Sequence, residues 1–184
     1  MQRIIVGISG ASGIIYGIRA LEILRDAGIE THLVMSRAAQ VTLAHETDMK
    51  VADVERLATV THRIRDIGAS ISSGSFKTMG MLVAPCSIRS LSEIASGVTS
   101  SLLSRAADVV LKERRRLVLL VRESPLHAGH LRSMAAVTEM GGIVAPPVPA
   151  FYAKPKTLDE MINHTVGRAL DLFDLNVSIK RWKE

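Results

Sequence analysis

Short apolar runs alternate with amphipathic stretches from the start of the chain. Residues 3–8 form an apolar, β-rich run that leads directly into the glycine-rich turn 7–13. A helical pattern covers residues 14–27, and a weakly alternating stretch follows at residues 30–35. Ser36 is a residue type that caps helix N-termini, so a helix is expected from the next residue. The opening pattern therefore predicts strand, helix, strand and helix in that order.

The same alternation continues toward the C-terminus. Ser87 precedes a helical pattern, and Thr157 begins a capping box for the final helix. The pair Ser124 and Pro125 is expected to supply the N-cap and first residue of another helix. The remaining expected elements are strands at 81–84, 117–122 and 143–145, and helices at 102–114, 126–140 and 157–173. A polar stretch at 61–65 precedes a loop of ligand-binding character at 72–80.

Alternating strands and helices with short connections predict an open, doubly wound parallel sheet of the Rossmann-like (flavodoxin-like) kind. Helices are expected on both faces, and the 184 residues suit a single α/β domain. Ligands of such sheets bind at the carboxyl ends of the strands, where the turns 7–13, 85–87 and 122–125 are expected. The proline-rich stretch from residue 146 does not suit a sheet, so the arm and helix at about 146–184 are expected to contact neighbouring subunits.

Composition narrows the class of ligand. Hydrophobic residues make up 47% of the chain but aromatic residues only 3%, so few rings are available to stack on bases. The formal net charge of +5 comes partly from the cluster Lys112, Arg114, Arg115 and Arg116, and small phosphorylated ligands suit it better than nucleic acid. The apolar runs fall far short of the ~20 residues of a membrane span, so a cytoplasmic protein without membrane contact is expected. The single cysteine, Cys86, excludes an internal disulfide.

Several residues invite a catalytic or metal-binding interpretation. The turn GISGASG offers backbone amides at a helix start, which favours a phosphate, but its spacing matches neither GxGxxG nor a Walker motif and equally suits a tight bend of small residues. Ser12 and Ser87 lie outside a GxSxG motif, and Cys86 has no histidine nearby in sequence to activate it. His127 and His130 are three residues apart without an evident third ligand, so no metal site is expected.

Five segments, in this order, resemble the UbiX/Pad1 family of flavin prenyltransferases. They are GISGASG at 7–13, Ser36, SGSFKTMGMLVAPCS at 73–87, RAADVVLKERRRLVLLVRESPL at 105–126, and PPVPAFY at 146–152. The resemblance implies transfer of a dimethylallyl group from dimethylallyl phosphate to N5 and C6 of reduced FMN, without a metal. It also implies a homo-oligomer, a dodecamer, whose product, prenylated FMN, passes to a UbiD-type decarboxylase.

The resemblance also assigns site residues. A metal-free site has to neutralise a departing phosphate with side chains, and arginine, lysine and tyrosine provide the donors for this. Glu123 is expected to be the acid/base that removes the proton from C6 of the flavin, while Glu46 and Arg105 either line the site or are ordinary helix-surface charges. The residues expected to bind FMN are Gly10, Ala11, Ser12, Ser36, Ser87, Ile88, Arg89, Ser90 and Arg122, and those expected at the prenyl phosphate are Lys112, Arg122, Tyr152 and Arg168.

Two other functions remain open at this point. One is an FMN-dependent decarboxylase of the aromatic-acid or cysteine type. Cysteine decarboxylases carry PASAN-like and PxMNxxM motifs, whereas this chain has APCSIRS at 84–90 and no counterpart of the second motif. The other is a carrier that stores FMN without altering it. The mass of the flavin after incubation with dimethylallyl phosphate distinguishes these functions from prenyl transfer.

Overall fold

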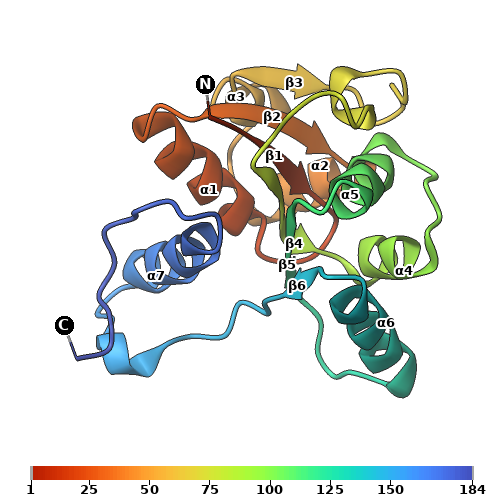
Figure 1. The fold of residues 1–184 in the computed structure, drawn as a ribbon. Helices are drawn as coiled ribbons and strands as arrows, with labels where there is room; N and C mark the ends of the chain where they lie inside the picture. The colour runs from red at the N-terminus through yellow and green to blue at the C-terminus, as the bar shows by residue number, and fades with distance from the viewer. Residues whose placement is uncertain (1, 184) are drawn as a thin grey trace.

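A six-stranded parallel sheet forms the centre of the computed structural model, which describes residues 2–183 (Figure 1). The strand order is β3-β2-β1-β4-β5-β6, the doubly wound order in which the succession of strands across the sheet reverses between β1 and β4. Each neighbouring pair is parallel. The strands are β1 (Arg3–Ile8), β2 (Glu30–Met35), β3 (Val60–His62), β4 (Gly80–Cys86), β5 (Arg116–Val121) and β6 (Ile143–Val144).

Helices cover both faces of the sheet. The apolar residues of α1 (Ile14–Asp26), α2 (Arg37–Glu46), α3 (Val51–Glu55) and α7 (Leu158–Asp171) belong to one core layer. Those of α4 (Ile88–Ser96), α5 (Leu102–Lys112) and α6 (Ala128–Glu139) belong to the other. In Figure 1, α1 and α7 lie on one side of the strands and α4, α5 and α6 on the other. The short 3₁₀ helices are η1 (Ser70–Ser72) and η2 (Phe151–Ala153). The predicted doubly wound α/β fold is confirmed.

The strand sequences explain this two-layered core. In β5, Val118 and Leu120 face the α1 and α7 layer, while Leu117 and Leu119 face the α5 layer, and all four are buried. Each buried aliphatic side chain contributes about 1.5–3 kcal/mol relative to an exposed one. A strand that is apolar on both sides therefore has to lie inside a sheet with helices on both faces.

Close packing brings α1 onto the end of β4. A Cβ atom at Gly17 would overlap the carbonyl oxygen of Ala84 and the side chain of Ile8. Gly13 at the start of the helix has a φ of 99°, a left-handed conformation that glycine adopts without steric cost. These two glycines fix where α1 begins relative to the neighbouring strand.

Most predicted element boundaries are confirmed, and one is wrong. Ser36, Ser87 and Thr157 cap α2, α4 and α7, each by accepting from a backbone amide three residues on. The pair Ser124 and Pro125 does not begin a helix, because α6 starts at Ala128 with His127 as its N-cap. The ring nitrogen Nδ1 of His127 accepts from the amide of Gly129 at 3.0 Å and replaces the expected serine cap.

Two short elements were not predicted from the pattern. The strand β3 overlaps the start of the polar stretch 61–65, and it pairs with β2 through its backbone while its side chains stay largely exposed. The helix α3 is only five residues long and buries just Val54. Within the described residues, no helix is long and apolar enough to cross a membrane.

Candidate functional site

Ser9 joins the turns at the carboxyl edge of the sheet. Its buried hydroxyl donates to the carbonyl of Pro85 at 2.9 Å and accepts from the amide of Ser87 at 2.7 Å. Two backbone hydrogen bonds extend this connection, from the Ser36 amide to Ile8 and from the Arg122 amide to Cys86. The ends of β1, β2, β4 and β5 are therefore held together at the point where the strand order reverses, which is the usual ligand site of this fold.

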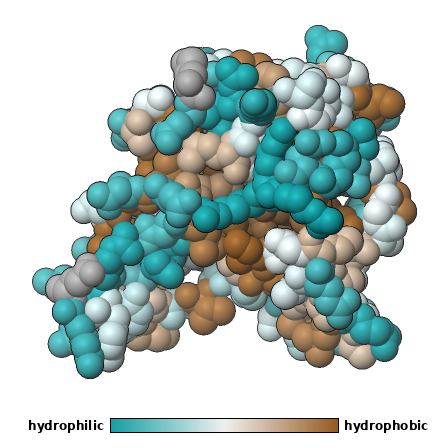
Figure 2. Space-filling view, viewed as in Figure 1, coloured by the Kyte–Doolittle hydropathy of each residue, from teal (hydrophilic) through white to brown (hydrophobic). Residues whose placement is uncertain are grey.

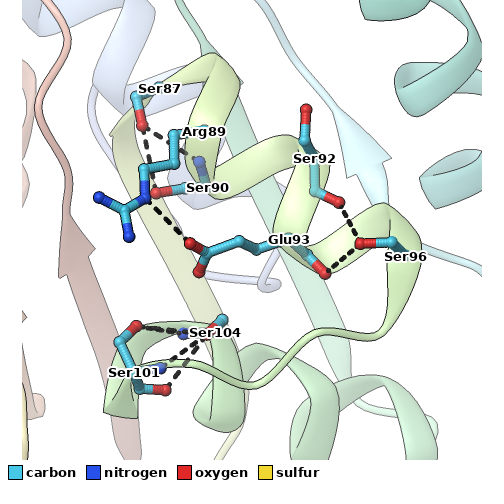
Figure 3. A network of polar contacts seen from close by, with 8 residues as sticks. All are labelled: Ser87, Arg89, Ser90, Ser92, Glu93, Ser96, Ser101 and Ser104. Atoms are coloured by element: carbon cyan, nitrogen blue, oxygen red, sulfur yellow. Dashed lines mark hydrogen bonds and ion pairs between the residues drawn. The ribbon is translucent and has the colours of Figure 1, made fainter.

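A cavity of about 270 Å³ opens at this edge, between the N-termini of three helices. Ser36, Ser87 and Ser101 cap α2, α4 and α5 respectively, and the last two helix starts are drawn in Figure 3. Positive helix ends that converge on one cavity favour an anion. The cavity is lined by Gly10, Ser36, Arg37, Ala38, Ile64, Arg65, Ser87, Arg89, Glu93, Ser100 and Ser101.

Unpaired backbone donors make this cavity suitable for a phosphate. Within the described residues, the amides of Arg37 and Ala38 at the start of α2 and of Ile88 and Arg89 at the start of α4 have no hydrogen-bond partner. A Cβ atom at Gly10 would overlap Ala38, so only glycine lets the turn after β1 come this close to α2. A flavin phosphate fits this cradle of amides, to which Arg37 adds positive charge.

The side chain of Arg89 is already engaged. Its Nε donates to Oε1 of Glu93 at 3.0 Å, one turn further along α4 (Figure 3). Ser87 meanwhile accepts from the amide of Ser90 and donates to the hydroxyl of that residue, both at 3.2 Å. The predicted segment 87–90 therefore reaches the cavity through Ser87 and Arg89, and only the Nε atom of the Arg89 guanidinium is paired with Glu93.

A second cluster forms at the start of α1. The Oε2 atom of Glu46 accepts from the amides of Gly13 and Ile14, both at 2.9 Å. Burial alone would raise the pKa of Glu46, but the Ser12 hydroxyl, these two amides and the nearby Arg122 together lower it below its ordinary value. The Gly13 and Ile14 amides are therefore satisfied by a carboxylate, whereas the amides at the starts of α2 and α4 stay open for an anion.

Arg122 and Glu123 follow β5 at the same edge. Arg122 acts electrostatically on Glu46 and on Tyr16, whose pKa is raised by burial and partly lowered again by the guanidinium. Glu123 is exposed, and its Oε1 accepts from the amide of Ser124 at 3.0 Å. Sequence reasoning missed Tyr16, which lies three residues after Gly13 on α1 and has no motif to mark it.

Tyr152 and Arg168 line a separate cavity of about 290 Å³, whose other walls include the apolar residues Leu120, Ala145 and Val148. Figure 2 shows apolar surface in the hollow between α7 and the helices on the other side of the sheet. The cavity thus combines an apolar wall with a hydroxyl and a guanidinium.

Asp171 organises the charges beside this cavity. Its Oδ2 accepts from Arg168 at 2.6 Å and from Arg181 at 2.7 Å. The hydrogen bond from Arg181 lowers the pKa of Asp171, burial opposes this, and Arg168 adds to the lowering. Asp171 therefore stays ionised and holds the Arg168 side chain. No sequence motif marked this residue.

The structure does not bring every predicted residue to this edge. Lys112 pairs with Glu113 at the end of α5, just before β5 begins, whereas Arg122 follows the end of that strand. Lys112 is therefore at the opposite, amino edge of the sheet, together with the loop around Gly74. Arg105 lies on α5 and pairs with Asp108 at 2.7 Å.

The neighbours of Lys112 in the basic cluster have structural contacts. Arg115 donates to the carbonyls of Gly74 and Phe76 at 2.6 and 2.8 Å, and Arg116 pairs with Asp174 at 2.7 Å. The segment expected to be a ligand-binding loop is thus fastened at the amino edge of its own chain. Among the residues that the structure describes, no three His, Cys, Asp or Glu side chains are grouped to hold a metal ion.

The doubly wound sheet and the cavity of helix N-termini define a flavin-binding class of α/β protein, and the family model described as Flavoprotein matches residues 1–170. Flavin prenyltransferase UbiX of Escherichia coli K12 is 59% identical over 187 residues, covering all of this chain and 99% of the relative. The chain therefore belongs to the UbiX family of flavin prenyltransferases.

Solved structures agree with this assignment. AnUbiX (PadA1), in complex with FMN and dimethylallyl pyrophosphate, is 49% identical and superimposes with a TM-score of 0.98, covering 100% of this chain and 98% of that one. A dodecameric FMN-dependent UbiX-like decarboxylase from Escherichia coli O157:H7 is 46% identical, with a TM-score of 0.96 and full coverage of both chains. The expected family, fold and flavin class are confirmed by these similarities.

Proposed function

We propose that this protein is a metal-independent flavin prenyltransferase that moves a dimethylallyl group from dimethylallyl phosphate to reduced FMN. The observation that carries the proposal is the presence, in one chain, of two complementary cavities. One has open helix N-termini for a flavin phosphate, and the other has an apolar wall beside Tyr152 and Arg168 for a short allyl phosphate. The similarity to AnUbiX, which binds FMN and dimethylallyl pyrophosphate, supports the same pair of ligands here.

The flavin would be held at the carboxyl edge of the sheet. The amides of α2 and α4 and the close turn at Gly10 suit its phosphate, and Ser87 to Ser90 and Arg122 suit the rest of the molecule. When bound, reduced FMN supplies N5 and C6 as the atoms to which the dimethylallyl group becomes joined. The protein supplies binding and orientation, and it keeps both ligands in place while the phosphate departs.

The side chains around the allyl phosphate would provide its electrostatic stabilisation. Arg122 and Arg168 bind and neutralise the phosphate as it leaves, and Tyr152 donates a neutral hydrogen bond to it. Lys112 adds a further positive charge when it is supplied by a neighbouring chain, because in its own chain it lies at the other edge of the sheet. Glu123, exposed next to Arg122, takes the proton that leaves C6.

The assembly and the use of the product follow from the same proposal. The arm and helix at about 146–184 would contact neighbouring subunits in a homododecamer, an assembly reported for the UbiX-like decarboxylase of Escherichia coli O157:H7. The prenylated FMN would then be released to a UbiD-type decarboxylase. The protein would therefore make the cofactor of a decarboxylase rather than decarboxylate an acid itself.

A single mass measurement tests the proposed reaction. The protein is loaded with FMN, reduced without oxygen and incubated with dimethylallyl monophosphate, and the flavin is then released and weighed. A gain of one C5H8 unit is expected, and a parallel sample without the donor is the control. Unaltered flavin would contradict the proposal and favour a carrier, and release of CO2 from an aromatic acid or a peptidyl cysteine would favour a decarboxylase.

A further inference from the structure

His164 lies buried behind the tyrosine of the allyl-phosphate cavity. It belongs to α7, one turn before Arg168, and only 8% of its surface is exposed. It lines the Tyr152 cavity on one side and a separate cavity of about 280 Å³ on the other. None of the sequence motifs marked this residue, and the reaction described above does not yet use it.

One ring nitrogen of His164 contacts two oxygen atoms. Its Nε2 is 3.2 Å from the hydroxyl oxygen of Tyr152 and 3.0 Å from the carbonyl oxygen of Lys180. A backbone carbonyl can only accept a hydrogen bond, so the bond to Lys180 requires a hydrogen on Nε2. The Lys180 carbonyl therefore selects the Nε2–H form of the imidazole.

This choice of tautomer determines what the tyrosine can do. A nitrogen that carries a hydrogen has no lone pair to accept with, so the Tyr152 hydroxyl cannot donate to His164. Its oxygen instead accepts from Nε2–H, which is shared between the two oxygens. The hydroxyl hydrogen of Tyr152 is left without an acceptor in His164, and it is free to point into the cavity that Tyr152 shares with Arg168.

Packing supports the same orientation. The rings of Tyr152 and His164 meet edge to face with their centroids 5.4 Å apart, and the rings of Tyr152 and Trp182 do the same at 5.3 Å. Edge-to-face pairs of this kind add about 0.5–1.5 kcal/mol beyond their buried area. The tyrosine ring is thus held by two aromatic neighbours while the histidine sets the direction of its hydrogen bond.

We propose that His164 is a positioning residue for prenyl transfer, which fixes Tyr152 as a hydrogen-bond donor to the phosphate of the allyl substrate. The inference rests on the proposed function for the identity of that phosphate. His164 acts only through the hydroxyl of Tyr152, and the Lys180 carbonyl keeps it in the required form.

A double-mutant cycle on the full-length, FMN-loaded protein tests this role. The dissociation constant of dimethylallyl monophosphate is measured for the wild type, His164→Phe, Tyr152→Phe and the double variant. Each single variant is expected to weaken binding about 10-fold, the loss of roughly one hydrogen bond to a charged group. The double variant should be no weaker than Tyr152→Phe alone, because both changes remove the same interaction. Multiplying effects would overturn the proposal.

A matched variant and a spectroscopic measurement distinguish the positioning role of His164 from a merely structural one. His164→Gln keeps an N–H donor, so its affinity should stay within about threefold of the wild type, whereas binding as weak as in His164→Phe would contradict the inference. NMR spectra of protein with ¹⁵N-labelled histidines show the tautomer directly. The signals of His164 are identified as those that disappear in His164→Gln. The Nε2–H form is expected, and a Nδ1–H form would overturn the proposal even if His164→Phe fails to fold.

These measurements separate this proposal from the proposed function. The tautomer and the affinity for dimethylallyl monophosphate are read without turnover, and FMN affinity should be equal in all variants. Suppose that the flavin mass never changes, but the double variant binds no more weakly than Tyr152→Phe and His164 is in the Nε2–H form. The proposed prenyl transfer is then wrong, while the role of Tyr152 as a hydrogen-bond donor to the bound phosphate still holds. If the flavin mass increases but the effects of the two substitutions on binding multiply, the proposed function stands and only the proposed role of His164 is wrong.

Discussion

Glu46 shows how a single carboxylate can hold the start of a helix. It accepts from the amides of Gly13 and Ile14, and those amides would otherwise lack partners in the first turn of α1. Its position also explains why the glycine-rich turn alone was a weak signal for phosphate. A tight turn, an occupied helix start and a nearby arginine together make one structural unit at the edge of the site.

Replacing Glu46 by Gln should destabilise the protein in a pH-dependent manner. The pKa of Glu46 is lowered in the folded state, so its stabilisation is present above the unfolded value of about 4.3 and is lost as the pH falls through the folded value. Unfolding at pH 7 should show a loss of about 0.5–1 kcal/mol that disappears once the pH falls below the lowered folded-state pKa of Glu46. Glu139→Gln, at the C-terminal end of α6, is the control and should show no such loss. A pH-independent difference would contradict this account.

Cys86 should behave as an inert buried thiol. Burial raises its pKa to about 12, and its side chain is fully buried at the end of β4. The thiolate fraction at pH 8 is therefore very small, and reagents cannot reach the sulfur. Titration with a chromogenic disulfide should detect no thiol in the native protein and one after denaturation. Rapid modification of the native protein would show that this part of the core opens.

Arg122 and Glu123 should differ in what they affect. Arg122→Ala should weaken the binding of FMN and of dimethylallyl monophosphate, because it removes a charge that acts before and during reaction. Glu123→Gln keeps the acceptor for the Ser124 amide, so flavin binding should persist while prenylated flavin forms ~100-fold more slowly. Single-turnover mass analysis measures both. A wild-type rate in Glu123→Gln would show that another group takes the proton.

At the scale of elements, the contact of α1 with β4 depends on a glycine. Gly17→Ala places a methyl group against the Ala84 carbonyl, and it should destabilise the protein by about 1–3 kcal/mol even though alanine favours helix by about 1 kcal/mol. Gly68→Ala is the control, because its Cβ would meet nothing closer than 3.6 Å. Denaturant unfolding at equal protein concentration compares the two. Equal stability of both variants would mean that α1 can shift without loss.

Helices and strands could be predicted where residues close together in the sequence determine them. The buried strands are apolar on both faces, and Ser36, Ser87 and Thr157 are common cap residues. The start of α6 was wrong because histidine is an unusual cap, and β3 was missed because its pairing depends on backbone bonds to β2.

Site residues, too, could be predicted only where a short sequence motif marks them. The turn residues were found because motifs mark them, and they lie at the predicted edge of the sheet. Ser9, Tyr16 and His164 were missed, since their roles depend on contacts with residues far along the chain, such as the bond from Ser9 to Pro85. A pattern of hydrophobic and polar positions has no information about such contacts.

At the scale of the whole molecule, the C-terminal region exposes large apolar side chains. Val148 and Phe151 in the arm are 71% and 74% exposed, and Leu158 and Trp182 are 72% and 66% exposed. Apolar side chains gathered in one region of the surface are typical of a protein interface. They support the proposal that this region contacts neighbouring subunits in the assembly.

The position of Lys112 also indicates that subunits contact one another at the site. Lys112 precedes β5 and Arg122 follows it, and the six residues of the strand span about 20 Å at ~3.3 Å per residue. One chain therefore cannot bring both side chains to a single phosphate. If both act in prenyl transfer, the lysine of one subunit has to serve the site of another.

Subunit mixing tests whether the site is shared between chains. Lys112→Ala and Glu123→Gln should each be nearly inactive alone, but randomly mixed assemblies of the two should regain about a quarter of wild-type activity. This is because one site in four then combines an intact lysine from one chain with an intact glutamate from another. Coexpression with two different tags allows mixed assemblies to be isolated, and their production of prenylated flavin is compared with that of each parent. The control is a mixture of Arg122→Ala and Glu123→Gln, adjacent residues of one chain, which should show no recovery. If both mixtures fail equally, Lys112 and Glu123 of one chain serve the same site, and the proposed sharing between chains is wrong.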